Sequence, residues 1–193
     1  MRRPVPGEEV CGDHPVAVDV GDSAALFGVI DGLGHGEAAQ TAALRAVEAV
    51  HNGRAEPLDV VMQLCHRALT DTRGVAMTLA RIDFETDTLS WIGIGNVTAD
   101  LVAKRPTAVE VRASALLAGG IVGYRMPQTL LTHQVSISPG DLLVIASDGI
   151  AEDHLASIDF AAQATTIAQQ QVGRYGKDTD DVLVLAARHR GAS

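Results

Sequence analysis

The pattern of apolar and polar residues near the N-terminus predicts a β-hairpin. Two segments rich in Val, Ile and Leu, PVAVDV and AALFGVI, flank the turn sequence Gly21-Asp22-Ser23. Asp13 lies eight positions before Gly21, and Asp31 lies nine positions after Asp22. A symmetric hairpin therefore places both aspartates at its open end.

Helical spacing of apolar residues replaces this pattern after the hairpin. The segment from Glu37 to Gly53 repeats Ala, Leu and Val at helical spacing and predicts a helix. A second helix is expected from about Pro57, a residue that suits a first helical turn. Its apolar stripe is formed by Val60, Val61, Leu64, Cys65 and Leu69. Together the two helices predict an αα-hairpin that covers one face of a sheet.

The middle of the chain predicts further strands. VAMTLARIDF, TLSWIGIGN and VTADLVAKR, within 75–105, are expected to form a strand meander. One or two more strands are expected in 108–137, with a turn at 119–123.

The C-terminal third predicts a strand, a helix and a last strand. LLVIAS is expected to be a buried strand, followed by a helix at about 159–173 and a strand at 182–187. The whole order is then β-β-α-α-β(several)-α-β, which favours an α+β layered sandwich over alternating βαβ units.

The composition narrows the class of protein. The 193 residues are 47% hydrophobic, and neither repeat nor linker divides them, so we expect a single domain over 1–193. The net charge of −9 argues against nucleic acid and against an anionic membrane surface, since both require clustered Lys and Arg. Because no apolar run approaches about 18 residues and no signal sequence is seen, we expect a soluble cytoplasmic protein whose partner is another protein.

Acidic residues stand at the ends of the predicted strands. Asp13 and the Asp180-Asp181 pair precede their apolar segments, whereas Asp31 and Asp148 follow theirs. In an antiparallel sheet the start of one strand lies beside the end of its neighbour, so these carboxylates can meet at one edge. Carboxylates within about 4–6 Å repel one another, and a cluster without basic partners is best explained by divalent cations. Oxygen ligands suit Mg²⁺ or Mn²⁺ rather than Zn²⁺.

Each of these motifs also has a purely structural interpretation. DGLGHG at 31–36 can be a plain strand-to-helix turn, and SDG at 147–149 and Asp180-Asp181 can be caps of turns or helices. Their combination favours a metal site. The chain contains neither a P-loop nor the GxSxG of a serine nucleophile.

Taken together, these motifs resemble a known family. Gly12-Asp13, DGLGHG, WIGIGN, SDGI and DDVLVL look like those of the metal-dependent protein phosphatases (PPM, type 2C), in their SpoIIE-like bacterial branch. The resemblance covers nearly the whole chain. TRGVAMTLA and GGIVGYRMP are most similar to the short stressosome phosphatases of this branch. The family's fold is a four-layer α-β-β-α sandwich with two mainly antiparallel sheets.

The resemblance implies roles for the aspartates. Asp31 would bridge two metal ions, Mn²⁺ or Mg²⁺, and the carbonyl of Gly32 would be a further ligand. Asp148 and Asp180 would each bind one metal, with Asp181 as the alternate to Asp180.

The chain departs from the family at three points. Asp13 matches the early acidic ligand position, but the family's preceding acidic partner is Gly12 here. Relatives outside this branch have a His directly after Asp-Gly, whereas the nearest here is His35, which we expect to be either the general acid or a structural residue at the helix start. The phosphate-binding Arg of eukaryotic relatives is missing, which leaves the metals, Arg73 or Arg125 to orient the phosphate.

The resemblance implies a protein serine/threonine phosphatase. Its substrates would be phosphorylated STAS-domain proteins of the stressosome, a bacterial signalling complex that dephosphorylation resets. Hydrolysis would use water activated between two cations, without a covalent intermediate. Two other functions stay open at this point: a catalytically silent scaffold or binding module with the PPM fold, and a metal-dependent hydrolase of small phosphate esters.

Overall fold

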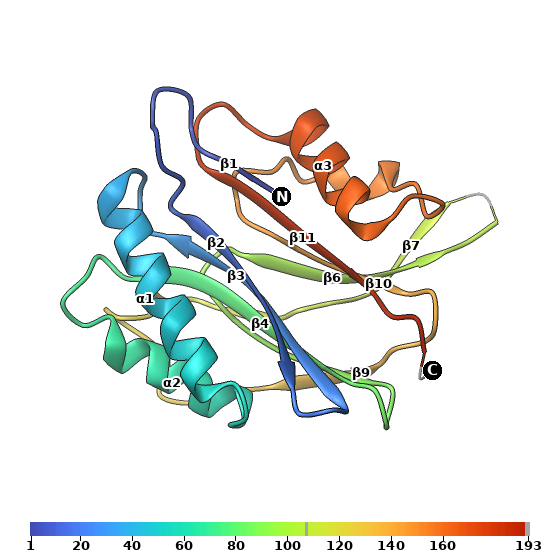
Figure 1. Ribbon diagram of the computed structural model, residues 1–193, viewed down its shortest axis with the longest axis horizontal. Helices are drawn as coiled ribbons and strands as arrows, with labels where there is room; N and C mark the ends of the chain where they lie inside the picture. Colours follow the sequence, from blue (N-terminus) through green and yellow to red (C-terminus); the bar gives the residue numbers. More distant parts are fainter. Residues whose placement is uncertain (107, 192–193) are drawn as a thin grey trace.

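Four layers of secondary structure are stacked in the computed structural model, which describes residues 1–106 and 108–191 (Figure 1). Helices α1 (Glu37–Gly53) and α2 (Leu58–Ala68) form one outer layer, and α3 (Ala164–Tyr175) forms the other. Two mainly antiparallel sheets lie between them. The expected α+β sandwich is confirmed. No helix within these ranges is long and apolar enough to cross a membrane.

The first sheet, sheet I, packs against α1 and α2. In spatial order the strands of sheet I are β2 (Asp13–Val20), β3 (Ala24–Gly32), β4 (Val75–Asp83), β5 (Thr88–Ile94) and β8 (Leu117–Ala118). A further strand, β9 (His133–Ser136), also pairs with β5.

The second sheet, sheet II, packs against α3 and against a short 3₁₀-helix, η1 (His154–Ser157). In spatial order the strands of sheet II are β1 (Arg2–Arg3), β11 (Val182–Arg188), β10 (Leu142–Ala146), β6 (Thr98–Lys104) and β7 (Val109–Ser114). The sequence did not indicate the two-residue edge strand β1.

The strand meander expected within 75–105 is wrong at its last strand. β4 and β5 form a hairpin of sheet I, but β6 pairs with β10 of sheet II. Gly95, just after β5, has a φ of 97°, in the region that favours glycine. The chain therefore turns from one sheet to the other at Gly95, and the alternation of apolar residues does not encode that change of partner.

Two helices also differ in detail from expectation. α3 begins at Ala164, five residues later than expected, because Asp159 accepts a hydrogen bond from the Ala161 N–H (2.9 Å) in a turn that precedes the helix. On α2, Met62 is fully buried, whereas Val60 and Leu64 from the expected stripe are only half-buried.

Alternation along the strands divides the apolar core into three parts. On β4, Met77 and Leu79 face α1 and α2, whereas Ile82 faces sheet II. On β10, Leu143 packs between the two sheets and Val144 packs against α3. Because both sheets are covered on both faces, their central strands contain nearly continuous apolar residues.

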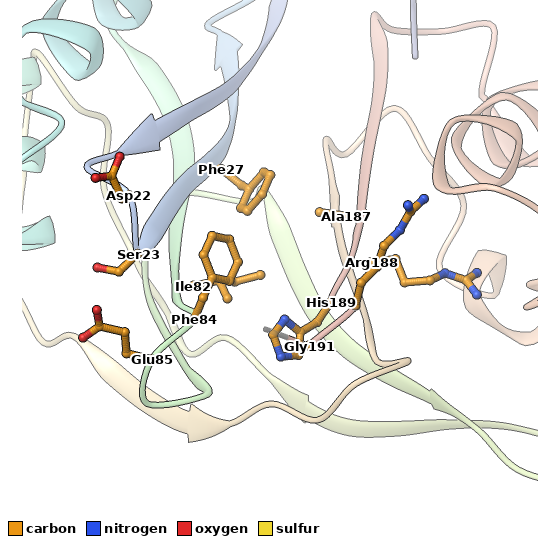
Figure 2. Close-up of a pocket in the computed structure, with 11 residues that line it drawn as sticks. Asp22, Ser23, Phe27, Ile82, Phe84, Glu85, Ala187, Arg188, His189 and Gly191 are labelled. Atoms are coloured by element: carbon orange, nitrogen blue, oxygen red, sulfur yellow. The ribbon is translucent and has the colours of Figure 1, made fainter. Parts of the chain in front are cut away.

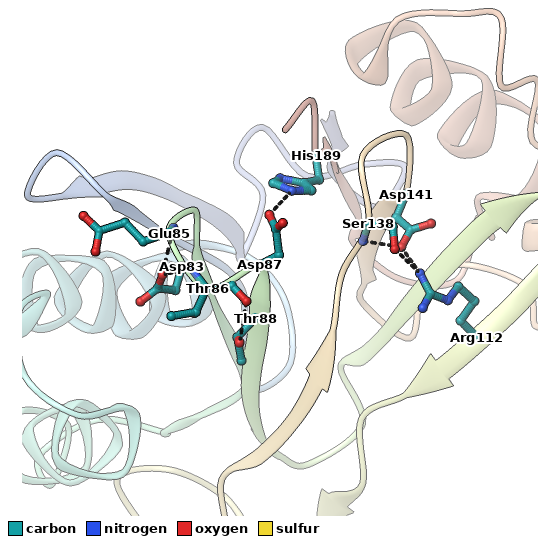
Figure 3. A network of polar contacts seen from close by, with 9 residues as sticks. All are labelled: Asp83, Glu85, Thr86, Asp87, Thr88, Arg112, Ser138, Asp141 and His189. Atoms are coloured by element: carbon teal, nitrogen blue, oxygen red, sulfur yellow. Dashed lines mark hydrogen bonds and ion pairs between the residues drawn. The ribbon is translucent and has the colours of Figure 1, made fainter. Parts of the chain in front are cut away.

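Polar contacts close the end of the sandwich that contains the β4–β5 turn (Figure 3). The Nε2 atom of buried His189, after β11, lies 2.8 Å from Oδ1 of Asp87 in that turn. Asp141, just before β10, accepts hydrogen bonds from the backbone N–H of Ser138 (2.8 Å) and from the guanidinium of Arg112 on β7. These contacts join sheet I to sheet II far from the predicted acidic strand ends.

The opposite end of the sandwich carries those strand ends. Asp13 lies directly opposite Asp31 in the register of β2 and β3, as the symmetric hairpin predicted. β10 ends two residues before Asp148, and its antiparallel neighbour β11 begins directly after Asp181. Since β11 also contacts β2 and β3, the acidic segments of the two sheets reach the same edge.

Replacing Leu143 by Ala should lower the free energy of unfolding by about 2–5 kcal/mol, because Leu143 is fully buried between the sheets. The matched control Leu44→Ala alters a residue that is 47% exposed on α1 and should change stability by less than about 0.5 kcal/mol. Chemical denaturation measures both. Equal losses in the two variants would contradict the described packing between the sheets.

Candidate metal centre

A pocket of about 140 Å³ lies at the edge where the acidic segments meet. Asp31 at the end of β3, Asp148 after β10 and Asp180 before β11 line it together. The remaining lining residues are Leu33, Gly34, Ala76 and Asn96. Three of the aspartates selected from the sequence are therefore brought together by the fold.

Glycines follow two of the pocket's aspartates and let the strand ends approach neighbouring backbone. A Cβ atom on Gly32 would overlap the carbonyl oxygen of Ala39 in α1. A Cβ atom on Gly149 would overlap the carbonyl oxygen of Asp181. Since no larger residue fits at either position, close backbone packing explains both Asp-Gly motifs and fixes where their carboxylates lie.

Burial and mutual repulsion raise the pKa values of the pocket's carboxyl groups. The pKa of Asp31 lies well above the ordinary carboxyl range, first because the group is buried and then because Asp13, Asp148 and Asp180 carry like charges. Burial and Asp180 also raise the pKa of Asp148, while the nearby Lys177 opposes that shift. Asp31 is therefore close enough to Asp13, Asp148 and Asp180 for their charges to raise its pKa.

Asp13 lies behind the pocket rather than in its wall. Its side chain is buried and accepts a hydrogen bond from the Ser147 hydroxyl (2.7 Å). Ser147 in turn accepts a hydrogen bond from the Leu183 N–H (2.9 Å), which ties β2 to β11. Burial raises the pKa of Asp13, although the Ser147 hydrogen bond favours its charged form. Gly32 is also buried, and its N–H donates to the carbonyl of Gly12 (3.3 Å).

The two adjacent aspartates before β11 differ in their surroundings. Asp180 is half-buried and lines the pocket. Asp181 is buried, and its two carboxylate oxygens accept hydrogen bonds from the backbone N–H groups of Val5 (2.8 Å) and Gly12 (2.7 Å). Of the pair, the structure thus brings Asp180 to the pocket and engages Asp181 with backbone.

Two polar residues beside Asp148 were not selected from the sequence. Asn96 donates from Nδ2 to Oδ2 of Asp148 (2.6 Å), and Lys177 donates from Nζ to the backbone carbonyl of Asp148 (2.7 Å). The signal for Asn96 was the motif WIGIGN, whose last glycine turns the chain at the pocket. Lys177 has no comparable sequence signal.

The other selected residues lie outside the pocket wall. His35 is exposed, and its Nδ1 lies 2.7 Å from Oε1 of Glu8. The guanidinium of Arg73 lies beside Gly34, 3.2 Å from the place where a Cβ atom would stand, and Gly34 lines the pocket. Arg125 is exposed in the turn that follows β8. Of Arg73 and Arg125, Arg73 is therefore the one that lies beside a pocket residue.

The donor set of the pocket fits Mg²⁺ or Mn²⁺. Asp31, Asp148 and Asp180 offer carboxylate oxygens, which are the ligands that these hard cations prefer. Within residues 1–106 and 108–191, no group of three or more His, Cys, Asp or Glu side chains is already assembled as a metal-binding cluster. Asp148 is hydrogen-bonded to Asn96 instead. The three carboxylates nevertheless line the same pocket.

A larger cavity, of about 730 Å³, lies at the other end of the sandwich (Figure 2). It opens between the β2–β3 turn and the residues that follow β11, with Phe27 and Phe84 near its centre and Asp22 and Glu85 on one side. The smaller pocket is the candidate site, because three carboxylates line it and the pKa of one of them, Asp31, is strongly raised.

Comparisons with known families and sequences show what this chain is similar to. The family model described as Stage II sporulation protein E (SpoIIE) matches residues 21–190. A curated protein, "Phosphoserine phosphatase RsbX" of Bacillus subtilis (strain 168), is 26% identical over 144 residues, which cover 75% of this chain and 69% of RsbX.

Solved structures match over nearly the whole chain. A chain from "The bacterial stressosome: a modular system that has been adapted to control secondary messenger signaling" is 31% identical, with a TM-score of 0.87, and the match covers 97% of this chain and 96% of that one. "Crystal structure of RsbX in complex with magnesium in space group P1" matches in fold, with 22% identity, a TM-score of 0.79, and coverage of 96% and 91%. The chain belongs to the SpoIIE family and carries its PPM-type phosphatase domain.

Proposed function

We propose that this chain is a serine/threonine phosphatase that acts on phosphorylated STAS-domain proteins of a bacterial stressosome and uses two Mn²⁺ or Mg²⁺ ions. We take residues 1–193 as one catalytic domain. The observation that carries the proposal is that Asp31, Asp148 and Asp180, from strands far apart in the sequence, line one pocket.

The relatives and the size of the pocket both support a protein substrate. RsbX is named a phosphoserine phosphatase, and the 31% identical chain comes from work on the stressosome. Pockets that enclose small molecules usually measure about 300–1,000 Å³. A pocket of about 140 Å³ suits a phosphoryl group presented on a protein surface better than a whole small-molecule ester.

In the proposed reaction the pocket's carboxylates hold divalent cations in fixed positions. Bound divalent cations would lower the pKa of water and offset the negative charge of the phosphoryl group. Asp31, Asp148 and Asp180 would hold them. The amide of Asn96 donates to Asp148 and limits the orientation of its carboxylate.

Residues around the pocket would adjust its charge and orient the phosphate. Asp13, held by Ser147 behind Asp31, adds negative charge that favours binding of a second ion. Arg73 lies beside Gly34 at the pocket, where a guanidinium can pair with phosphoryl oxygens. His35 is paired with Glu8 outside the pocket wall, so we do not assign it as the proton donor.

Replacing Asp31 or Asp148 by Asn should reduce Mn²⁺-dependent hydrolysis on the order of 100-fold or more, because each variant loses a charged ligand. The assay uses a phosphoserine STAS-domain protein and p-nitrophenyl phosphate in parallel, each with and without chelator. Asp19→Asn, at an exposed position of β2, is the matched control and should keep full activity. Full activity in either pocket variant would contradict the proposal, and turnover of the small ester alone would support the small-ester hydrolase instead.

The metal-free protein should lose stability as the pH rises from about 5 to about 8. Asp13 and Asp31 have raised pKa values, so the folded state binds their protons more tightly than the unfolded chain, and ionisation above the ordinary carboxyl pKa favours unfolding. Added Mn²⁺ should raise Tm more at the higher pH, because protons compete with the metal.

Thermal melts of wild type and Asp31→Asn, each with chelator and with Mn²⁺, measure this effect. The variant should show a flatter pH dependence in chelator and a smaller response to Mn²⁺. A wild-type protein that gains stability over this pH range relative to Asp31→Asn would contradict the described repulsion.

Replacing Arg73 by Ala should raise KM for the phosphoprotein by about 10-fold, since a charged hydrogen bond to phosphate is lost. Arg125→Ala should have a smaller effect, because Arg73 is the arginine shown beside the pocket. Arg45→Ala removes a surface arginine that pairs with Asp71 and serves as the control. If Arg73→Ala leaves KM at the Arg45→Ala value, Arg73 does not orient the phosphate.

A further inference from the structure

The first twelve residues, Met1–Gly12, form a segment that we call the N-terminal arm. Its strand β1 pairs with β11, with Arg3 opposite Val182, two residues after Asp180 (Figure 1). We propose that the arm positions the segment 176–181 and, through it, Asp148 and Asp180, and thereby sets the affinity of the site for divalent cations. This inference rests on the proposed function.

Arg3 is the arm's main side-chain contact with that segment. Its Nη1 atom donates to Oδ1 of Asp178 (2.8 Å), and its Nη2 atom donates to the backbone carbonyl of Lys177 (2.7 Å). A guanidinium can hold two acceptors in fixed directions at once, whereas the single ammonium of Lys is a point charge on a flexible chain. Arg3 therefore fixes both the backbone and a side chain of the segment.

Lys177 carries the contact on to the turn after β10. Its backbone N–H donates to the carbonyl of Gly149 (2.8 Å), and its Nζ donates to the carbonyl of Asp148 (2.7 Å). Both acceptor carbonyls belong to the Asp148-Gly149 motif, and the carboxylate of Asp148 lines the pocket. Arg3, Lys177 and Asp148 thus form one continuous chain of hydrogen bonds from the arm to the pocket.

Asp181 anchors the same segment to the arm from the other side. Its carboxylate accepts the backbone N–H groups of Val5 and Gly12, which lie at two separate points of the arm. A Cβ atom on Gly12 would stand only 2.8 Å from the Cβ of Ala39 and 3.0 Å from Oδ2 of Asp181, so this approach requires glycine. The N–H of Asp181 also donates to Oδ1 of Asp180 (2.9 Å). The arm therefore constrains the residue next to the pocket carboxylate.

Because the Arg3 side chain is partly exposed, its role in positioning the pocket can be measured separately from its effect on folding. The side chains of Arg3 and Asp178 are 37% and 77% exposed, and ion pairs this exposed contribute only about 0–1 kcal/mol to stability. Loss of Arg3 should therefore alter the geometry of the pocket more than the stability of the fold. Metal affinity, measured beside thermal stability, distinguishes the two roles.

The test titrates MnCl₂ into the full metal-free chain by calorimetry. Arg3→Ala and Lys177→Met should raise the Mn²⁺ dissociation constant by about 10-fold, the usual effect of residues that orient metal ligands, and Arg3→Lys should fall between Arg3→Ala and wild type. Melting temperatures of Arg3→Ala in chelator should stay within about 2–4 °C of wild type. Arg105→Ala breaks a comparable exposed ion pair, with Glu110 in the β6–β7 hairpin, and should leave the Mn²⁺ affinity unchanged.

Amide hydrogen exchange without metal gives a second readout. The N–H of Lys177, which donates to Gly149, should exchange faster in Arg3→Ala than in wild type and Arg105→Ala. If wild type binds Mn²⁺ and both Arg3→Ala and Lys177→Met bind it equally well, the role of the arm is refuted while the proposed function stands. If wild type neither binds Mn²⁺ nor hydrolyses phosphoserine, the proposed function fails and this inference fails with it.

Discussion

Repulsion between buried carboxylates is the constraint on which the site depends. β2 and β3 are paired so that Asp13 faces Asp31, and the second sheet brings Asp148 and Asp180 to the same edge. Burial removes the water that would solvate a charged Asp31 carboxylate, and the neighbouring carboxylates then repel it, so its pKa is raised far above the ordinary range. A fold that held these groups together without a cation would lose stability, so their arrangement favours a site for hard divalent ions.

The chain holds these charges in place mainly through its backbone. The Asp-Gly motifs let strand ends contact α1 and the β11 segment at distances that exclude any side chain at Gly32 and Gly149. Asp181 illustrates the same principle, since it accepts two backbone N–H groups while its neighbour Asp180 lines the pocket. Two identical residues in sequence therefore have different surroundings, one bonded to backbone and one at the pocket.

The sequence predicted those parts of the structure that follow from local periodicity. The length of the first hairpin was enough to place Asp13 opposite Asp31, because pairing in a symmetric hairpin is set by its turn. The helix from Glu37 to Gly53 was predicted with its observed bounds because Ala, Leu and Val recur there at helical spacing. The resemblance of the motifs to PPM phosphatases supplied the four-layer arrangement, which the apolar pattern alone had left as a layered α+β sandwich.

Contacts between distant segments could not be predicted in this way. Nothing in the apolar pattern of β6 distinguishes pairing with β5 from pairing with β10, since a central strand is apolar in either sheet. The N-terminal arm has too few apolar residues to indicate a strand, and it is ordered by polar contacts with residues more than 170 positions away. Asn96 and Lys177 were missed because their shared partner, Asp148, lies 52 and 29 positions away along the chain.

We propose that Asp31, Asp148 and Asp180 hold divalent cations in one pocket. Diffraction from crystals grown with MnCl₂, recorded at the manganese absorption edge, locates bound manganese directly. We expect two anomalous peaks in this pocket, beside the carboxylates of Asp31, Asp148 and Asp180. An absence of peaks in this pocket at saturating Mn²⁺, or peaks only elsewhere on the protein, would contradict it.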